Sequence, residues 1–341
     1  MSRSGSVGVG VIGAGFIGQT HLRAFAGVEG CRLAGVCDAD PARLLGRAES
    51  SGNLGADSTE VIFDPEATWT GHDPLALIEH PEVDLVCVCT PTDTHVDLAK
   101  CALDAGKHVL VEKPVAISSD RVRELRDHAA TSGSVCVPAM CVRFWPGWDS
   151  LPARVRSGEH GGCRSVRFTR VGAAPAWSPF YADAARSGDA LFDLHVHDVD
   201  MVHQCFGPPT RLHSSGSTRH VITTYEFEGH DARVVAEGGW IDDPDAPFRM
   251  RYEAGFERAQ VDFDLSRTPP LRMLEGDEVT PLKTLLGTGW DVQARTLLGA
   301  IQTGEFDRLP TLAEALEVTL TLEAERQSLQ SGKPVEVRRG G

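Results

Sequence analysis

Three glycines near the start of the chain constrain its fold more than any other feature. The segment Gly13-Ala-Gly15-Phe16-Ile17-Gly18 follows an apolar run at residues 7–12 and precedes a segment with helical periodicity. In such a strand–turn–helix unit, the first glycine permits a tight turn, the second lets the backbone approach a pyrophosphate, and the third lets the helix pack closely on the strand. The phosphates would lie at the positive end of the helix dipole. We therefore predict a dinucleotide site formed by Gly13, Gly15, Phe16, Ile17 and Gly18.

An acidic residue after the second apolar run makes a glycine-rich turn without a ligand the weaker alternative. Asp38 lies twenty positions after Gly18, where a carboxylate accepts hydrogen bonds from the adenosine ribose hydroxyls. The same carboxylate would repel a 2′-phosphate, because like charges about 4 Å apart cost about 4 kcal/mol at an effective dielectric of about 20. Ala39 follows where an arginine could bind that phosphate, although Arg43 is nearby. We expect NAD as the cofactor, with NADP as the less favoured alternative.

The remaining chain shows two patterns in succession. As far as about residue 139, short apolar runs alternate with amphipathic stretches, which is typical of βαβ units in a parallel sheet. Within this part, residues 46–70 show little periodicity, and we expect one strand there, at 60–63. Beyond residue 145, alternating residues predict antiparallel strands. Helical periodicity interrupts them at 190–204 and returns at 290–302 and 312–329.

Charge and composition exclude several classes of protein. The chain has 33 Lys and Arg against 48 Asp and Glu, a formal net charge of -15, which disfavours nucleic acid as a partner. No apolar stretch approaches the roughly 20 residues of a membrane span, and no signal-peptide core is visible, so we expect a soluble cytoplasmic protein with no membrane partner. The nine cysteines include no C-x-x-C pair and are interpreted as reduced core residues.

Two short motifs follow predicted parallel strands at the carboxyl edge of their sheet. Thr90-Pro91, with His95, comes after residues 83–89, and Glu112-Lys113-Pro114 comes after residues 108–111. Open α/β sheets bind their ligands at this edge, so we assign Thr90, Pro91, His95, Glu112 and Lys113 to the cofactor site. A lysine placed there can also hydrogen-bond a substrate oxygen and, if partly desolvated, transfer a proton. A surface lysine paired with Glu112 is the alternative.

A second set of titratable residues lies in the helical segment after Gly188. Helical spacing places Asp193, His197 and Asp200 on one face, while His195 points elsewhere. A histidine beside a carboxylate suits general acid–base catalysis near neutral pH, because the carboxylate fixes the tautomer and stabilises the imidazolium. The His-x-His sequence also suggests a metal site, but the two side chains diverge on a helix, so we expect no metal. A purely structural histidine is the other alternative.

Together these motifs resemble the Gfo/Idh/MocA oxidoreductases, named for glucose–fructose oxidoreductase and inositol dehydrogenase. The resemblance covers nearly the whole chain and includes the ending from Glu323 to Val335. It implies an α/β protein with an amino-terminal Rossmann domain at 1–142 and a carboxyl-terminal α/β domain at 143–341. The second domain would carry a large, mostly antiparallel open sheet that supports a homodimer or homotetramer, while the terminal helices could pack back on the Rossmann domain.

The resemblance also implies an activity and catalytic residues. Lys113 matches the family's catalytic lysine, and Asp193 and His197 match its D-x-x-x-H motif. The implied reaction is hydride transfer between NAD and a secondary hydroxyl of a sugar, inositol or related polyol. His197 would be the general base, Asp193 would orient it, and Lys113 would polarise the oxygen. The usual Gly-Gly before this helix is Gly188-Asp189 here, a departure that could change the turn.

Several alternatives stay open at this stage. Some relatives use transient oxidation by bound NAD to cleave glycosides, and a few proteins on this scaffold bind a dinucleotide only to regulate a partner. Arg143 either touches the substrate or forms a salt bridge. A group of aromatic residues forms either a sugar-stacking wall or part of the core or a subunit interface: Trp145, Trp148, Trp177, Phe180 and Tyr181.

Overall fold

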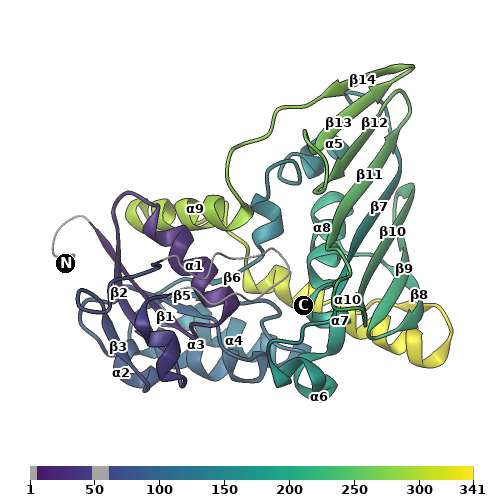
Figure 1. The fold of residues 1–341 in the computed structure, drawn as a ribbon. Helices are drawn as coiled ribbons and strands as arrows, with labels where there is room; N and C mark the ends of the chain where they lie inside the picture. The colour runs from purple at the N-terminus through teal and green to yellow at the C-terminus, as the bar shows by residue number, and fades with distance from the viewer. Residues whose placement is uncertain (1–5, 48–60, 341) are drawn as a thin grey trace. The chain divides into compact units, whose positions relative to one another are not determined.

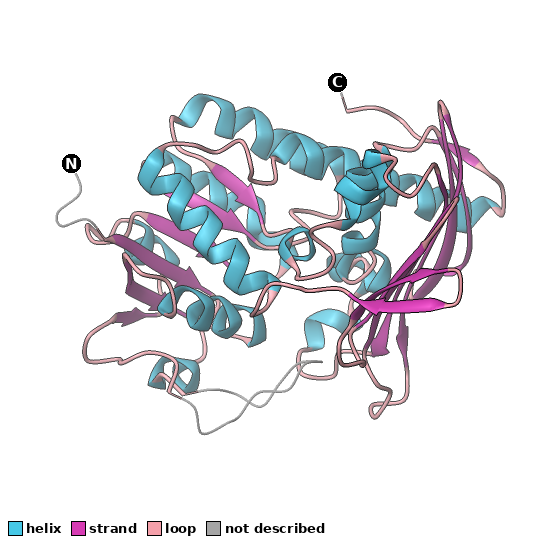
Figure 2. Ribbon diagram, turned by 90° about the horizontal axis from the view of Figure 1, so that it is seen from above, coloured by secondary structure: helices cyan, strands magenta, loops and turns pink. Residues whose placement is uncertain are grey.

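The computed structural model describes residues 6–47 and 61–340 and divides into two compact units (Figure 1). The first unit comprises Met1–Cys141 and Thr288–Ala315, and the second comprises Val142–Gly287 and Leu316–Gly341. Each unit contains its own β-sheet, drawn in magenta in Figure 2, with helices beside it. The predicted fold class, an α/β protein with a parallel and a mostly antiparallel sheet, is confirmed.

The first unit is built on a six-stranded parallel sheet with the order β3-β2-β1-β4-β5-β6. This is the doubly wound order, in which the strand order reverses between β1 and β4, and sheets of this type bind their ligands at the carboxyl ends of these strands. Every residue of β1 and β4 is buried, which explains the continuous apolar runs in the sequence. The strands are β1 Val7–Ile12, β2 Cys31–Cys37, β3 Trp69–Gly71, β4 Leu85–Val88, β5 His108–Val111 and β6 Cys136–Pro138.

Helices pack on this sheet and include one from far along the chain. They are α1 Phe16–Ala26, α2 Pro74–Ile78, α3 His95–Asp104, α4 Ser119–Ser132 and α9 Gly289–Thr303. Helix α9 lies against α1, and a capping box between Thr288 and Asp291 starts it. The helices expected at 290–302 and 312–329 are confirmed by α9 and by α10 Leu312–Ser331. Among the helices of residues 6–47 and 61–340, none combines the length and apolar character that crossing a bilayer requires.

The strand expected at residues 60–63 is wrong. Residue 60 lies outside the described part of the chain, and Val61 forms only an isolated bridge with Arg47. The third strand of the sheet is instead β3, in which Trp69, Thr70 and Gly71 pair with β2. Pairing with β2 therefore selects a short segment whose own sequence has little alternation.

The second unit contains a nine-stranded sheet with the order β14-β13-β12-β11-β7-β10-β9-β8-β15. Neighbouring strands are antiparallel except β7 and β10, which are parallel. Residues of β9 alternate between buried and exposed, as expected for a sheet with one covered face. The strands are β7 Cys163–Ala173, β8 Arg211–Ser217, β9 His220–Phe227, β10 His230–Ile241, β11 Arg249–Phe256, β12 Gln260–Asp264, β13 Leu271–Glu275, β14 Glu278–Pro281 and β15 Val335–Glu336.

Helices α7 Asp189–Asp193 and α8 Val196–Phe206 lie against this sheet (Figure 1). The single helix expected at 190–204 is therefore wrong, because the chain forms two helices with a joint at Leu194 and His195. The backbone amides of both joint residues donate to the carbonyl oxygen of Ala190, each at 2.9 Å, which interrupts the regular helical ladder. The short helices α5 Leu151–Ser157 and α6 Ala184–Ser187 complete the unit.

Candidate functional site

The glycine loop connects β1 to α1 at the edge where β4 and β5 also end. Gly13 has a φ of +91°, and a side chain there would place its Cβ 2.5 Å from the carbonyl oxygen of Cys89. A Cβ on Gly18 would overlap the carbonyl oxygen of Gly13, so only glycine lets α1 approach the turn. Gly15 caps α1 without any side-chain hydrogen bond to its first amides. A helix start of this kind can bind a phosphate through its backbone amides.

Asp38 lies beside this loop, at the end of β2. One carboxylate oxygen accepts a hydrogen bond from the amide of Ala14 at 2.7 Å, and the other accepts from the amide of Asp40 at 2.8 Å. The Arg43 guanidinium lies 3.6 Å from the carboxylate and close to Gly15. His72 bonds to the carbonyl oxygen of Asp38 at 2.8 Å. The structure thus brings Asp38 to the glycine loop and adds Arg43 and His72, which the motif spacing did not select.

His95 connects two of the predicted motifs. Its Nε2 lies 2.8 Å from the carbonyl oxygen of Thr90 and its Nδ1 lies 3.0 Å from that of Pro114. Burial lowers the pKa of His95 below its ordinary value, against the opposing effect of these two carbonyl groups. The Thr90 hydroxyl pairs with that of Thr94 at 2.6 Å. His95 therefore connects the ends of β4 and β5, and its contact with a cofactor stays a prediction.

Glu112 holds the backbone of Lys113 at the end of β5. Its carboxylate lies 2.6 Å from His21 Nε2 and accepts a hydrogen bond from the Lys113 amide at 2.9 Å. Burial acts to raise the pKa of Glu112, but the hydrogen bond and charge of His21 together with the Lys113 charge outweigh it, so this pKa lies below its usual value. His21, on α1, was not selected from the sequence because a lone histidine on an apolar helix face carries no motif. Lys113 itself is half-buried and precedes a cis peptide bond to Pro114.

In the second unit, Asp193 ends α7 and His197 lies in the first turn of α8, almost fully buried. The expected i, i+4 relation between them therefore spans the joint and is not set by one continuous helix. The turn that precedes α7 keeps a left-handed conformation at both Gly188 and Asp189, with φ values of +73° and +56°. The Asp189 carboxylate accepts a hydrogen bond from the Thr218 hydroxyl at 2.6 Å. Asp189 thus adopts a backbone conformation that a second glycine would readily adopt.

Asp200, one turn after His197, pairs with Arg143. The Arg143 Nε and Nη2 atoms donate to the two carboxylate oxygens at 2.8 and 2.6 Å, and both side chains are largely buried. Of the two roles considered for Arg143, the structure contains the salt bridge, which lies within the second unit. Bidentate pairs of this type hold a guanidinium in one orientation.

The aromatic residues that the sequence grouped together separate into two sets. Trp148 is fully buried and packs with Phe168, Tyr252 and Phe263, so it belongs to the core of the second unit. Trp177 contacts Tyr181, with ring centroids 5.7 Å apart, and Tyr181 in turn contacts Trp240 at 6.0 Å. Trp177 and Tyr181 are half-buried, and Tyr181 packs against the buried cluster of Ala190, Leu194 and Trp240.

Comparison with known proteins identifies the family. Residues 7–140 match the model of an oxidoreductase family with an NAD-binding Rossmann fold, and residues 148–246 match the Gfo/Idh/MocA carboxyl-terminal domain. The chain belongs to the Gfo/Idh/MocA family. The resemblance inferred from its motifs is confirmed.

Similar proteins carry the names of dehydrogenases. The scyllo-inositol 2-dehydrogenase (NAD(+)) of Bacillus subtilis is 31% identical over 58% of this chain and 53% of its own length. The inositol 2-dehydrogenase of Rhizobium meliloti is 30% identical over 59% of this chain and 56% of its own. The match thus spans little more than half the length of these relatives.

Solved structures share the fold across nearly the whole chain. A levoglucosan dehydrogenase in complex with NADH superposes with a TM-score of 0.81 over 98% of this chain and 100% of its own, at 20% identity. An oxidoreductase domain protein from Kribbella flavida gives the same TM-score and coverage at 22% identity. At this level of identity the likeness establishes the fold.

Proposed function

We propose that this protein transfers a hydride reversibly between NAD and a secondary hydroxyl carbon of a sugar, inositol or related polyol. One observation carries the proposal: a half-buried lysine, Lys113, is held by Glu112 at the same sheet edge as the glycine loop. Relatives named inositol and glucoside dehydrogenases support this substrate class. A homodimer or homotetramer and a cytoplasmic location, expected from the sequence, stay predictions.

The residues of the first unit fit the proposed cofactor. The amides at the start of α1 would bind the pyrophosphate, and Asp38 would accept the ribose hydroxyls. Bound NAD would supply the nicotinamide carbon that accepts or returns the hydride. Thr90, Pro91, His95 and Glu112 would shape the pocket at the ends of β4 and β5.

The proposed catalytic residues would transfer the proton of the substrate hydroxyl and stabilise the charge on its oxygen. In the oxidation direction, the imidazole of His197 takes the hydroxyl proton, and Asp193 stabilises the resulting imidazolium. The ammonium of Lys113 donates a hydrogen bond to the substrate oxygen, which stabilises the negative charge that develops as the proton leaves. In the reduction direction the same proton returns to the oxygen from His197.

A screen of sugars, sugar acids and inositols, with NAD and then with NADP, tests the proposed function. We expect at least one cyclic polyol or sugar to produce reduced nicotinamide, detected by its absorbance. Cleavage of a glycoside without accumulation of NADH would instead identify a hydrolase that uses NAD transiently. Tight NAD binding without turnover of any compound would indicate a regulatory protein and contradict the proposal.

Cofactor preference is a separate prediction. We expect NADP to bind at least about tenfold more weakly than NAD, because a 2′-phosphate would approach the Asp38 carboxylate, and the nearby Arg43 offsets only part of the repulsion. Asp38→Asn should reduce the difference in affinity between NAD and NADP, since it removes the negative charge and keeps an oxygen that accepts from the Ala14 amide. Asp40→Asn, which alters the neighbouring exposed carboxylate, is the matched control. Affinities for the two cofactors that lie within about tenfold of each other in the unaltered protein, measured by titration calorimetry, would refute the preference.

A further inference from the structure

A buried polar cluster lies behind the joint between α7 and α8, and the proposed mechanism uses none of its members. His195, at the joint, is 0% exposed, as is Glu325 of α10. The His195 Nε2 lies 3.2 Å from a Glu325 carboxylate oxygen and 3.3 Å from the Tyr225 hydroxyl. Tyr225, on β9, donates to the other Glu325 oxygen at 2.6 Å. The joint is thereby connected to both a helix and a strand of the second unit.

Side chains from several elements face this imidazole. Beside Tyr225 and Glu325 there are Asp198 of α8 and Arg170 of β7, whose Nε lies 3.1 and 3.2 Å from the two Asp198 oxygens. At Gly238, strand β10 leaves room for the ring only because it has no side chain there, since a Cβ would lie 2.5 Å from His195 Nδ1. The His195 ring thus lies between the β10 backbone and a set of polar and charged side chains.

The charges around His195 favour its protonated form. Burial acts to lower its pKa, but the charge and hydrogen bond of Glu325, together with Asp198, outweigh both burial and the opposing Arg170 charge, so the pKa lies above its ordinary value of 6.5. Burial also raises the pKa of Tyr225 well above its ordinary value, and Glu325 adds to this effect, so the phenol remains a donor. Folding therefore favours the imidazolium form of His195 beside Glu325, where both side chains are shielded from solvent.

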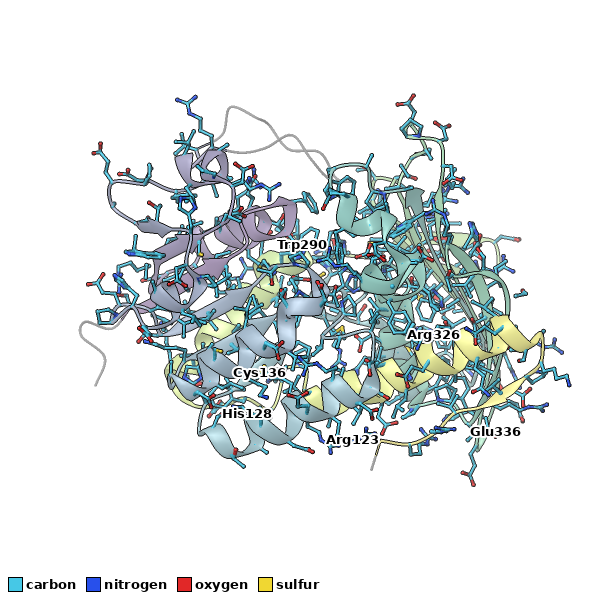
Figure 3. The ribbon with its side chains drawn as sticks, turned by 90° about the horizontal axis from the view of Figure 1, so that it is seen from below. Arg123, His128, Cys136, Trp290, Arg326 and Glu336 are labelled. Atoms are coloured by element: carbon cyan, nitrogen blue, oxygen red, sulfur yellow. The ribbon has the colours of Figure 1, made fainter. Side chains whose placement is uncertain are left out.

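The side chain of His195 does not cap the helix that it precedes. It stands at the N-cap position of α8, but its ring makes no cap hydrogen bond and is directed to Glu325 instead. The residue after Glu325 is Arg326, which is labelled on α10 in Figure 3. Its guanidinium lies 5.2 Å from the ring centroid of Phe192 on α7. Two adjacent residues of α10 therefore contact the joint and the helix before it.

We propose that His195 is a positioning residue: its ring, held by Glu325 and Tyr225, sets the joint between α7 and α8 and so the placement of Asp193 relative to His197. The roles of Asp193 and His197 rest on the proposed function, whereas the protonation of His195 does not. Folding raises the pKa of His195, so the ion pair between His195 and Glu325 is present below that raised pKa. The pair is lost as the pH rises through the pKa that His195 has in the folded protein. Activity should therefore decline on the alkaline side as the joint loosens.

Glu325→Gln tests this proposal through kcat, KM and their pH dependence. We expect kcat to fall about a hundredfold while KM for NAD changes little, because small misplacement of catalytic groups costs rates of that order. The alkaline limb of the kcat profile should also move to lower pH. Thr321→Val is the matched control, since it removes another polar contact between α10 and α8, the 3.0 Å bond to His203, and should leave the profile unchanged. An equal kcat loss in both variants, or an unshifted limb in Glu325→Gln, would overturn the proposal.

Two further measurements keep the proposal testable if Glu325→Gln does not fold or if no substrate is found. Tyr225→Phe keeps the packing and removes only the hydroxyl that donates to Glu325. It should lower kcat about tenfold, a smaller loss than in Glu325→Gln. Heteronuclear NMR of protein labelled at the histidine nitrogens, with His195→Asn to assign the signal, reports protonation without turnover. We expect the ring of His195 to titrate above the ordinary value of 6.5. A ring that titrates at or below 6.5, or unchanged kcat in Tyr225→Phe, would contradict the proposal.

Discussion

Replacement of Lys113 or His197 by alanine is expected to lower turnover by about two to four decades while NAD still binds. Lys113 would no longer stabilise charge on the substrate oxygen, and without His197 no positioned base would accept its proton. NAD affinity should persist because the glycine loop and Asp38 are unaltered. Steady-state kinetics with a substrate found in the screen, together with NAD titration, measures both effects.

Two substitutions outside the proposed site serve as controls for this prediction. Lys100→Ala removes a lysine that pairs with Glu124. His128→Ala removes a histidine of α4, labelled in Figure 3, which bonds to Asp104 at 2.8 Å. Both should retain nearly full turnover. Undiminished turnover in both Lys113→Ala and His197→Ala would reject the assignment of these residues to catalysis.

Asp198→Ala is expected to destabilise the second unit by about 3–5 kcal/mol. Asp198 is 0% exposed, and its carboxylate lies against Arg170, whose guanidinium also stacks over Trp148 at 5.1 Å from the ring centroid. Without the carboxylate, the Arg170 charge would remain buried with its main partner removed. Denaturant unfolding followed by tryptophan fluorescence should detect the loss, because Trp148 lies in the same core.

The control for this stability prediction is an ion pair at the surface. Asp242 pairs with Arg219 where both side chains are well exposed, so Asp242→Ala should cost less than about 1 kcal/mol. The double substitution Arg170→Met with Asp198→Leu should recover much of the loss, since it removes both charges from the interior. A loss in Asp198→Ala no larger than that in Asp242→Ala would show that the buried pair contributes little.

The first unit was largely predictable because its signals are local. The tight turn at Gly13, the close approach at Gly18 and the carboxylate at Asp38 follow from spacing along a strand–turn–helix unit. Lys113 could be selected as a candidate because it directly follows a buried strand. Arg43 was noted as a neighbour of Asp38, but His21 was missed, since its importance comes from a contact with Glu112 that exists only once the sheet has formed.

The second unit was predicted less completely. Periodicity over residues 190–204 suits one amphipathic helix, and nothing local marks the break at His195. The partners of that residue, Tyr225 and Glu325, lie far along the chain, so their contribution cannot be read from a window of sequence. The same holds for β3, which forms at Trp69–Gly71 because β2 offers it a pairing edge.

The sequence by itself determined the dinucleotide fold, the family and the candidate catalytic side chains, because steric demands of glycine, strand and helix periodicity and short motifs act between near neighbours. Only the tertiary structure decided how α7 meets α8 and which charges are buried behind that joint. The physical reason is that removing water from His195, Glu325, Asp198 and Arg170 requires several distant elements to pack together. Their pairing energies depend on that exclusion of solvent.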